Sequence, residues 1–143
     1  MEHVFGTQLI GHNGPVATSN VTFRYKLVYF SAKWCPLCKV FTSQLASFYS
    51  LVNSYEQIFE VLFVSYDRNK SDFNEYFNEM PWLAVKYEDR KRIGKLEKRF
   101  GVHDVPFLAL IDDDGNIKSK DAKNDIITKG IRALNEWDAA LYK

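Results

Sequence analysis

The chain of 143 residues contains only two cysteines and no marked excess of charge of either sign, with 19 Lys and Arg against 18 Asp and Glu. Two cysteines are too few for a secreted scaffold held together by disulfides. Because a sequence-independent nucleic-acid binder normally carries a large basic excess, the charge balance argues against nucleic acid as a partner. The hydrophobic content of 46% excludes a disordered tail, a collagen-like fibre and a low-complexity linker, so a globular protein is expected.

Long hydrophobic runs are also missing. No segment approaches the roughly 18 consecutive apolar residues that span a bilayer, and residues 1–14 lack both the basic start and the apolar core of a secretory signal. These absences favour a reducing compartment, with the cytoplasm expected and the nucleus compatible, and no membrane partner. The tripeptide Asn20-Val21-Thr22 fits the glycosylation pattern, and without a secretory route we interpret it as a chance match.

Apolar runs and turn signals predict the strands. Asn13-Gly14, between short apolar pairs, predicts an N-terminal β-hairpin. The segments 26–31 and 59–66 are nearly continuous in apolar residues, which is typical of parallel strands covered on both faces. Asp113-Asp114-Gly115-Asn116 predicts a second hairpin, which joins a strand at 107–111 to the one that follows.

Apolar residues at intervals of three or four predict amphipathic helices. Ser71 is expected to cap one of them, and Pro81 to stop it. Gly101 is expected to end the next helix, and Gly130 is a weak point in the last one. The predicted helical stripes cover residues 37–52, 73–80, 93–100 and 127–141.

The predicted order of elements is β, β, α, β, α, short α, β, β, α. The alternation of strand and helix in the first half requires a right-handed crossover and a parallel central pair of strands. The second half adds an antiparallel edge. Because no internal repeat or linker interrupts the chain, residues 1–143 are predicted to form a single α/β domain, with a mixed central β-sheet flanked by helices on both faces.

Both cysteines lie in one four-residue stretch, Cys35-Pro36-Leu37-Cys38, between a predicted strand and a predicted helix. At the start of a helix, converging backbone N–H groups and the positive end of the helix dipole stabilise a thiolate. A thiolate attacks a substrate disulfide to form a mixed disulfide, and a second thiol three residues on can resolve it. We therefore predict Cys35 as the nucleophile and Cys38 as the resolving thiol.

Two alternatives compete with a redox role for the cysteine pair. Zinc requires about four ligands, and the histidines, His3, His12 and His103, stand in no paired spacing, so no metal is expected. Two inert core cysteines are the other alternative, since free cysteine is often buried. A strand-to-helix junction within a βαβ pattern favours redox chemistry over both.

Several stretches of the chain carry a family resemblance and follow one another in that family's order. They are Phe30-Ser31-Ala32-Lys33-Trp34-Cys35-Pro36-Leu37-Cys38, Phe41-Thr42, Phe48-Tyr49, Val64-Ser65-Tyr66-Asp67, Met80-Pro81-Trp82-Leu83-Ala84-Val85, Val105-Pro106 and Asp114-Gly115. On these residues the sequence resembles the thioredoxin superfamily, and within it the tryparedoxin/nucleoredoxin branch, over roughly residues 20–143. The resemblance implies a thioredoxin fold.

The resemblance also implies a disulfide reductase without a metal or organic cofactor, because the redox-active group is the Cys35–Cys38 disulfide itself. It implies that the Val105–Pro106 peptide bond is cis, a geometry that only an X-Pro bond adopts at low cost. Pro106 would then face the cysteine pair, and the backbone of Val105 would pair with an extended substrate segment.

Other side chains are candidates near the same site. The resemblance places Trp34 over the nucleophile as an apolar lid and Trp82 on the far side of the substrate surface, with core packing as the alternative for each. Asp67, at the end of a predicted strand, is a candidate for proton handling or, equally, for a helix cap. We interpret His103 as an exposed loop residue and the basic run 90–99 as a solvated helix face.

The chain departs from the family pattern at several positions. Pro36 and Leu37, expected to border the active site, stand where typical thioredoxins have Gly-Pro and tryparedoxins usually have Pro-Pro. The dipeptide between the cysteines affects the redox potential. Tyr29 replaces the buried Asp of typical thioredoxins, as in the tryparedoxin pattern. Lys86 replaces a family Pro, which changes the expected partner surface.

Two functions follow as expectations. The first is a cytoplasmic, monomeric thiol–disulfide oxidoreductase that reduces protein disulfides, with peroxiredoxins among its partners by family analogy. Its electron donor would be a low-molecular-weight dithiol, glutathione or a thioredoxin reductase. The alternative is a nucleoredoxin-like redox-sensing module that binds partner proteins with little turnover. A disulfide-forming oxidase would need a secretory signal, which residues 1–14 lack.

Overall fold

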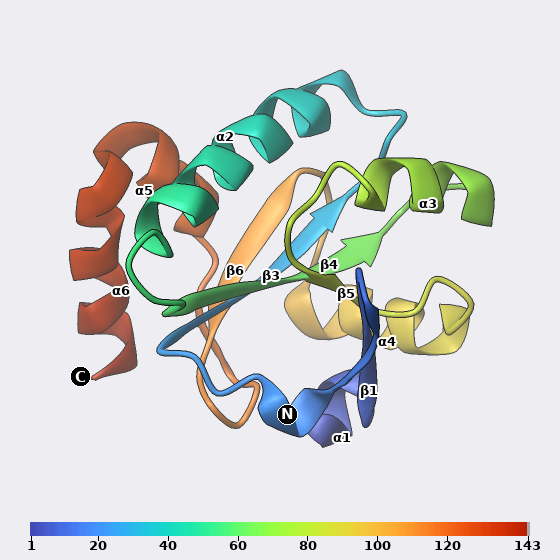
Figure 1. Cartoon of the computed structure of the whole chain (residues 1–143), viewed down its shortest axis with the longest axis horizontal. Coiled ribbons are helices and arrows are strands. Elements are labelled where there is room, and N and C mark those ends of the chain that lie inside the picture. Colours follow the sequence, from blue (N-terminus) through green and yellow to red (C-terminus); the bar gives the residue numbers. More distant parts are fainter. Residues whose placement is uncertain (143) are drawn as a thin grey trace.

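A mixed β-sheet lies between two layers of helices in the computed structural model, which describes residues 1–142 (Figure 1). The strands are β1 (Gln8–Gly11), β2 (Gly14–Ala17), β3 (Tyr25–Ser31), β4 (Phe59–Ser65), β5 (Leu83–Ala84), β6 (Phe107–Ile111) and β7 (Ile117–Ser119). The α-helices are α1 (Glu2–Phe5), α2 (Pro36–Val52), α3 (Lys70–Phe77), α4 (Arg90–Phe100), α5 (Ala122–Lys129) and α6 (Ala133–Leu141). Within residues 1–142, every helix is too short or too polar to cross a bilayer.

The sheet brings the ends of three strands together at one edge. Its order is β2-β1-β5-β4-β3-β6-β7. β3 and β4 run parallel, so Ser31 and Ser65 lie side by side where both strands end. β6 is antiparallel to β3, which places Phe107, at its start, opposite Phe30. The loops that follow β3 and β4 and the loop that precedes β6 therefore meet at this edge, which carries the cysteines.

Two hydrophobic cores cover the two faces of the sheet, because side chains of β3 and β4 alternate between them. One core joins the sheet to α2, α3, α5 and α6, and the other joins it to α1 and α4. Figure 1 shows α2 and α3 above the sheet and α1 and α4 below it. Both central strands are buried along their whole length, which explains their continuous apolar runs and confirms the predicted α/β architecture.

The predicted N-terminal hairpin is confirmed. β1 and β2 pair antiparallel around the turn at Asn13-Gly14, with Leu9 opposite Val16. The hairpin joins the main sheet through β5, where Ile10 pairs with Ala84. The strand β5 and the helix α1 were not predicted, because elements of two and four residues are too short to show a periodic pattern.

Two predicted helix details are wrong. Asn69, not Ser71, caps α3, since its side chain accepts the hydrogen bond of the Asp72 N–H. The C-terminal stripe is not one helix, because Gly130 adopts a positive φ of 56° and separates α5 from α6 by a 3-10 turn. Ile127, a member of that stripe, is consequently 54% exposed rather than buried.

Candidate active site

Cys35 is the N-cap of α2. Its side chain accepts a hydrogen bond from the backbone N–H of Cys38, with Sγ and N 3.2 Å apart. Pro36 occupies the first position of the helix, where the N–H that proline lacks would have no intrahelical partner. The first turn of α2 contains no acidic residue. The Cys35 sulfur therefore lies at the positive end of the helix dipole. A hydrogen bond such as the one from the Cys38 N–H is stronger when its acceptor carries negative charge.

The two thiols differ in access. Cys35 is 7% exposed, whereas Cys38, one turn into the helix, is fully buried. Both are free thiols in this structure. Cys35 is thus the more exposed of the two, as predicted from the Cys-x-x-Cys spacing, and Cys38 lies three residues further into the helix.

The Val105–Pro106 peptide bond is cis, as the resemblance implied. The carbonyl oxygen of Val105 lies 3.9 Å from Sγ of Cys35, which brings the loop before β6 against the start of α2. Both loop residues are partly exposed. The ammonium group of Lys123, on α5, donates a hydrogen bond to the Pro106 carbonyl at 3.2 Å.

Trp34 lies at the surface beside Cys35, since its side chain is 48% exposed. Its indole N–H donates to the carbonyl of Tyr66 at 3.1 Å, and the guanidinium of Arg68 lies 5.3 Å from the ring centroid. The core-packing alternative for Trp34 is thereby excluded. Pro36 and Leu37 are also exposed, and with Trp34 they form an apolar border around the accessible sulfur.

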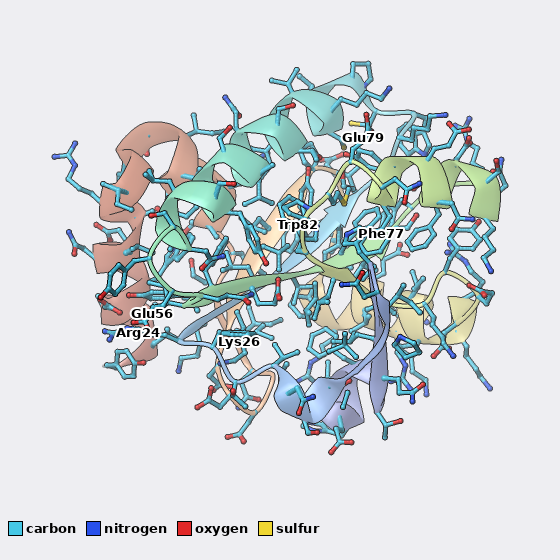
Figure 2. All side chains as sticks on the ribbon, viewed as in Figure 1. Arg24, Lys26, Glu56, Phe77, Glu79 and Trp82 are labelled. Atoms are coloured by element: carbon cyan, nitrogen blue, oxygen red, sulfur yellow. The ribbon has the colours of Figure 1, made fainter. Side chains whose placement is uncertain are left out.

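Trp82 is not at the substrate surface, and the predicted position is wrong. Its side chain is fully buried, and Figure 2 shows it inside the molecule, between α2 and the sheet. Its ring packs edge-on against Tyr29 and Tyr49, with centroids 6.2 and 5.6 Å apart. The alternative weighed from the sequence, ordinary core packing, is the correct one for this residue.

Asp67 holds the backbone that leads to Cys35. Its buried carboxylate accepts hydrogen bonds from the Lys33 N–H and the Ser65 hydroxyl, both at 2.7 Å. It does not cap α3, which begins after Asn69. No hydrogen bond within residues 1–142 joins it to either cysteine, so its visible role is to fix the turn that precedes Trp34 and Cys35.

A cluster of buried hydroxyl groups below Cys38 was missed by the sequence interpretation. Ser31 and Thr42 each contact the hydroxyl of Tyr76, at 2.7 and 2.6 Å, and Tyr29 contacts Thr42 at 2.8 Å. Tyr29 also donates to the Cys38 carbonyl. Burial raises the pKa values of Tyr29 and Tyr76, so both stay protonated at neutral pH. Tyr29 had a sequence signal, as the replacement for the thioredoxin Asp, and Ser31 and Thr42 lie in stretches that carry the family resemblance, but nothing in the sequence joined them to Tyr76.

The environment of Cys38 favours its neutral form. Burial raises the pKa of this thiol to about 11, and the hydrogen bond with Cys35 adds to the rise. The Ser31 hydroxyl and the Ala32 backbone act in the opposite direction. Since a thiolate is the attacking species in disulfide exchange, Cys38 stays a protonated thiol until a reaction at Cys35 engages it.

This pKa predicts the pH dependence of alkylation. In a Cys35→Ala variant, the rate of Cys38 alkylation by iodoacetamide is expected to keep rising above pH 9, because a raised pKa moves thiolate formation to higher pH. Mass spectrometry at successive pH values measures the rate. The same variant in urea is the control, and its rate should level off near the ordinary thiol pKa of about 8.5. A folded-state rate that levels off by pH 9 would contradict a raised Cys38 pKa.

The remaining candidates lie outside this constellation. His103 is exposed, and the basic residues of the 90–99 run lie along α4, whose apolar side contributes Ile93, Leu96 and Phe100 to the core. In the part of the chain that the structure describes, no group of three His, Cys, Asp or Glu side chains is placed to hold a metal ion.

The fold and site define a thioredoxin-fold protein with a Cys-x-x-Cys dithiol at the start of a helix and a cis-proline beside it. The chain belongs to the thioredoxin-like family, whose model matches residues 24–117. It is homologous to the tryparedoxins and nucleoredoxins and is a thioredoxin-family oxidoreductase.

Individual relatives agree on this membership. Tryparedoxin of Trypanosoma brucei brucei is 38% identical over 132 residues, which cover 92% of this chain and 91% of that protein. Nucleoredoxin of Danio rerio is 40% identical over 118 residues, but the match covers 82% of this chain and only 27% of that protein. The chain therefore spans about a quarter of that nucleoredoxin and nearly the whole of the tryparedoxin.

Solved structures show the same fold. Tryparedoxin from Trypanosoma brucei has a TM-score of 0.85 at 36% identity, with 93% of this chain and 92% of that chain covered. Tryparedoxin II complexed with glutathionylspermidine has a TM-score of 0.82 at 33% identity and 88% coverage of both chains.

Proposed function

We propose that the protein is a protein-disulfide reductase that acts through Cys35 and Cys38. The observation that carries the proposal is the position of the Cys35 sulfur. It caps α2, accepts the Cys38 N–H and lies 3.9 Å from the carbonyl of Val105 in the cis-proline loop. An extended substrate segment that pairs with Val105 would place its disulfide over Cys35.

The reaction has two exchange steps. The Cys35 thiolate attacks one sulfur of the substrate disulfide, which forms a mixed disulfide and releases the other substrate sulfur as a thiolate that takes up a proton. Cys38 then loses its proton and attacks the Cys35 sulfur, which releases the second substrate thiol and leaves the Cys35–Cys38 disulfide. The substrate gains two electrons and two protons, and the protein loses them.

The side chains around the sulfurs have distinct parts in this scheme. Trp34, Pro36 and Leu37 supply an apolar surface for the substrate, and Asp67 fixes the turn that holds Trp34. The dithiol is itself the redox group, so no further cofactor is needed. We propose disulfide-containing proteins, peroxiredoxins among them, as partners, with a thiol or a reductase regenerating the dithiol.

Insulin reduction tests the proposal. With dithiothreitol as donor, the protein is expected to accelerate precipitation of the insulin B chain well above the rate with dithiothreitol alone. A Cys38→Ser variant should form stable mixed disulfides with its substrates in a cell extract, and mass spectrometry identifies them. The Cys35→Ser, Cys38→Ser double variant is the control for nonspecific capture. If the protein does not accelerate insulin reduction, the reductase proposal is contradicted.

A further inference from the structure

Two cationic side chains border the dithiol from different elements. Arg68, in the loop after β4, places its guanidinium 5.3 Å from the centroid of the Trp34 ring, and Trp34 directly precedes Cys35. Lys123, on α5, donates from its ammonium group to the carbonyl of Pro106 at 3.2 Å. The adjoining Val105 carbonyl lies 3.9 Å from Sγ of Cys35. Arg68 and Lys123 are termed the cationic rim below.

Both charges of the cationic rim are held by uncharged partners. The aromatic face of Trp34 and the carbonyl of Pro106 orient Arg68 and Lys123 without cancelling their charge. Neither side chain forms a salt bridge with a carboxylate of residues 1–142. Each cation is therefore positioned and available to an incoming molecule.

The acidic residues nearby are mostly engaged elsewhere. Asp67 is buried and bonded to the Lys33 N–H and to Ser65. Asp72 and Glu75 both pair with the ammonium group of Lys33. Asp104, next to Val105, and Asp121, two residues before Lys123, are exposed acids that neighbour these residues in the chain. The positive end of α2, without an acidic residue in its first turn, adds to the cationic side at the sulfur itself.

We propose that the cationic rim selects an anionic thiol, glutathione, as the small-molecule partner of the dithiol. This inference rests on the proposed function and names its electron donor. Each glutathione carries two carboxylates and one ammonium group, so both the thiol and its disulfide are anionic. A polyamine conjugate such as glutathionylspermidine, the molecule in the tryparedoxin II complex, adds ammonium groups that Arg68 and Lys123 repel.

The regenerating reaction balances with two glutathione molecules. The first glutathione thiolate attacks the Cys35 sulfur of the Cys35–Cys38 disulfide, forms a mixed disulfide and releases Cys38, which takes up a proton. The second thiolate attacks the glutathione sulfur of that mixed disulfide and releases the Cys35 thiolate. The products are glutathione disulfide and the reduced protein. Both glutathione molecules approach the sulfur past the cationic rim.

Charged disulfides test the selection directly. Reduced protein is mixed with glutathione disulfide (anionic), cystamine (cationic) or hydroxyethyl disulfide (neutral), and the rate of its oxidation is measured in each case at low salt and pH 7. The measured quantity is the ratio of the anionic rate to the cationic rate, in which any equal effect of a variant on the reactivity of the thiol cancels. The rate with the neutral disulfide shows separately whether a variant changes that reactivity or the placement of Trp34.

Charge reversals at the rim are expected to lower this ratio. The Arg68→Glu, Lys123→Glu double variant should lower it at least about tenfold, with each single variant intermediate, because two fixed cations become anions. Salt at about 0.5 M should reduce the difference between wild type and variant. The matched control is Lys91→Glu on α4. Lys91 is exposed, and α4 packs on the face of the sheet opposite to α5, which carries Lys123.

The outcomes separate this inference from the proposed function. Selection by the cationic rim is overturned if the ratio is unchanged in the double variant, or if it falls equally in Lys91→Glu. The proposed reductase function is not affected by either result, as long as the protein reduces insulin with dithiothreitol. A protein that fails to reduce insulin with dithiothreitol, which is uncharged, contradicts the proposed function itself. A selective fall in the rim variants, with the control at the wild-type ratio, supports glutathione as the donor.

Discussion

Replacing Cys35 by serine is expected to abolish insulin disulfide reduction, with a loss of at least about a thousandfold, the order of effect that follows removal of a nucleophile. A serine hydroxyl stays protonated at neutral pH and cannot form a disulfide, so neither exchange step can begin. The measurement is the rate of insulin reduction at a fixed concentration of dithiothreitol. A Cys35→Ser variant with half of the wild-type rate would contradict the assignment of Cys35 as nucleophile.

This substitution is informative because it should leave the fold intact. Serine is among the preferred N-cap residues, so its hydroxyl can replace Sγ as the acceptor of the Cys38 N–H. The free energy of unfolding should change by less than about 1 kcal/mol. Cys38→Ser is the matched variant. It should also stop turnover, but it retains the first step and accumulates a mixed disulfide on Cys35, visible on a non-reducing gel.

The sequence predicts the frame of the site well, because the frame depends on local patterns. Continuous apolar runs mark β3 and β4 as buried central strands, and the 3.6-residue period marks α2. Cys35 and Cys38 then occupy the junction of strand and helix by chain connectivity alone. The cis geometry at Pro106 came instead from the family resemblance, since no local pattern distinguishes a cis from a trans X-Pro bond.

The hydroxyl cluster below Cys38 shows what local patterns cannot predict. Ser31, Thr42 and Tyr76 come from β3, α2 and α3 and meet only because those elements pack on one face of the sheet. Each residue alone is an ordinary member of its element. Gly130 is a different case, since its low helix propensity was visible in the sequence, whereas the positive φ that divides the last helix was not.

The two tryptophans proposed for the site show the same limit. The residues next to Trp34 and Trp82 in the sequence do not show which of the two is buried. A large aromatic side chain is equally suited to a hydrophobic core and to a binding surface. The structure separates them, with Trp34 48% exposed and Trp82 fully buried. Truncating the side chain should therefore cost far more stability at position 82 than at position 34.

Trp82→Ala is expected to lower the free energy of unfolding by about 3–5 kcal/mol, the usual cost of truncating a buried aromatic side chain. The ring fills space between Tyr29 and Tyr49 in the core shared by α2 and the sheet. Because small proteins are stable by about 5–15 kcal/mol, this loss is a large fraction of the total. Urea unfolding followed by far-UV circular dichroism measures it without relying on tryptophan fluorescence.

Trp34→Ala is the matched control, since it removes the same side chain from an exposed position. Its expected cost is below about 1 kcal/mol, so equal losses in the two variants would contradict the burial of Trp82. Trp82→Phe should recover most of the stability. It refills much of the volume and discards an indole N–H that is buried without a hydrogen-bond partner among residues 1–142.

The Trp82 substitution also reaches the dithiol through Tyr29. The Trp82 ring supports Tyr29, whose hydroxyl contacts Thr42 and the Cys38 carbonyl. A cavity at position 82 gives Tyr29 room to move and admits water towards Cys38, which weakens the burial that raises the pKa of this thiol. Added to the Cys35→Ala background, Trp82→Ala should therefore shift the alkylation profile of Cys38 to lower pH. Trp34→Ala in the same background should leave that profile in place, because Trp34 contacts the Tyr66 loop rather than the hydroxyl cluster.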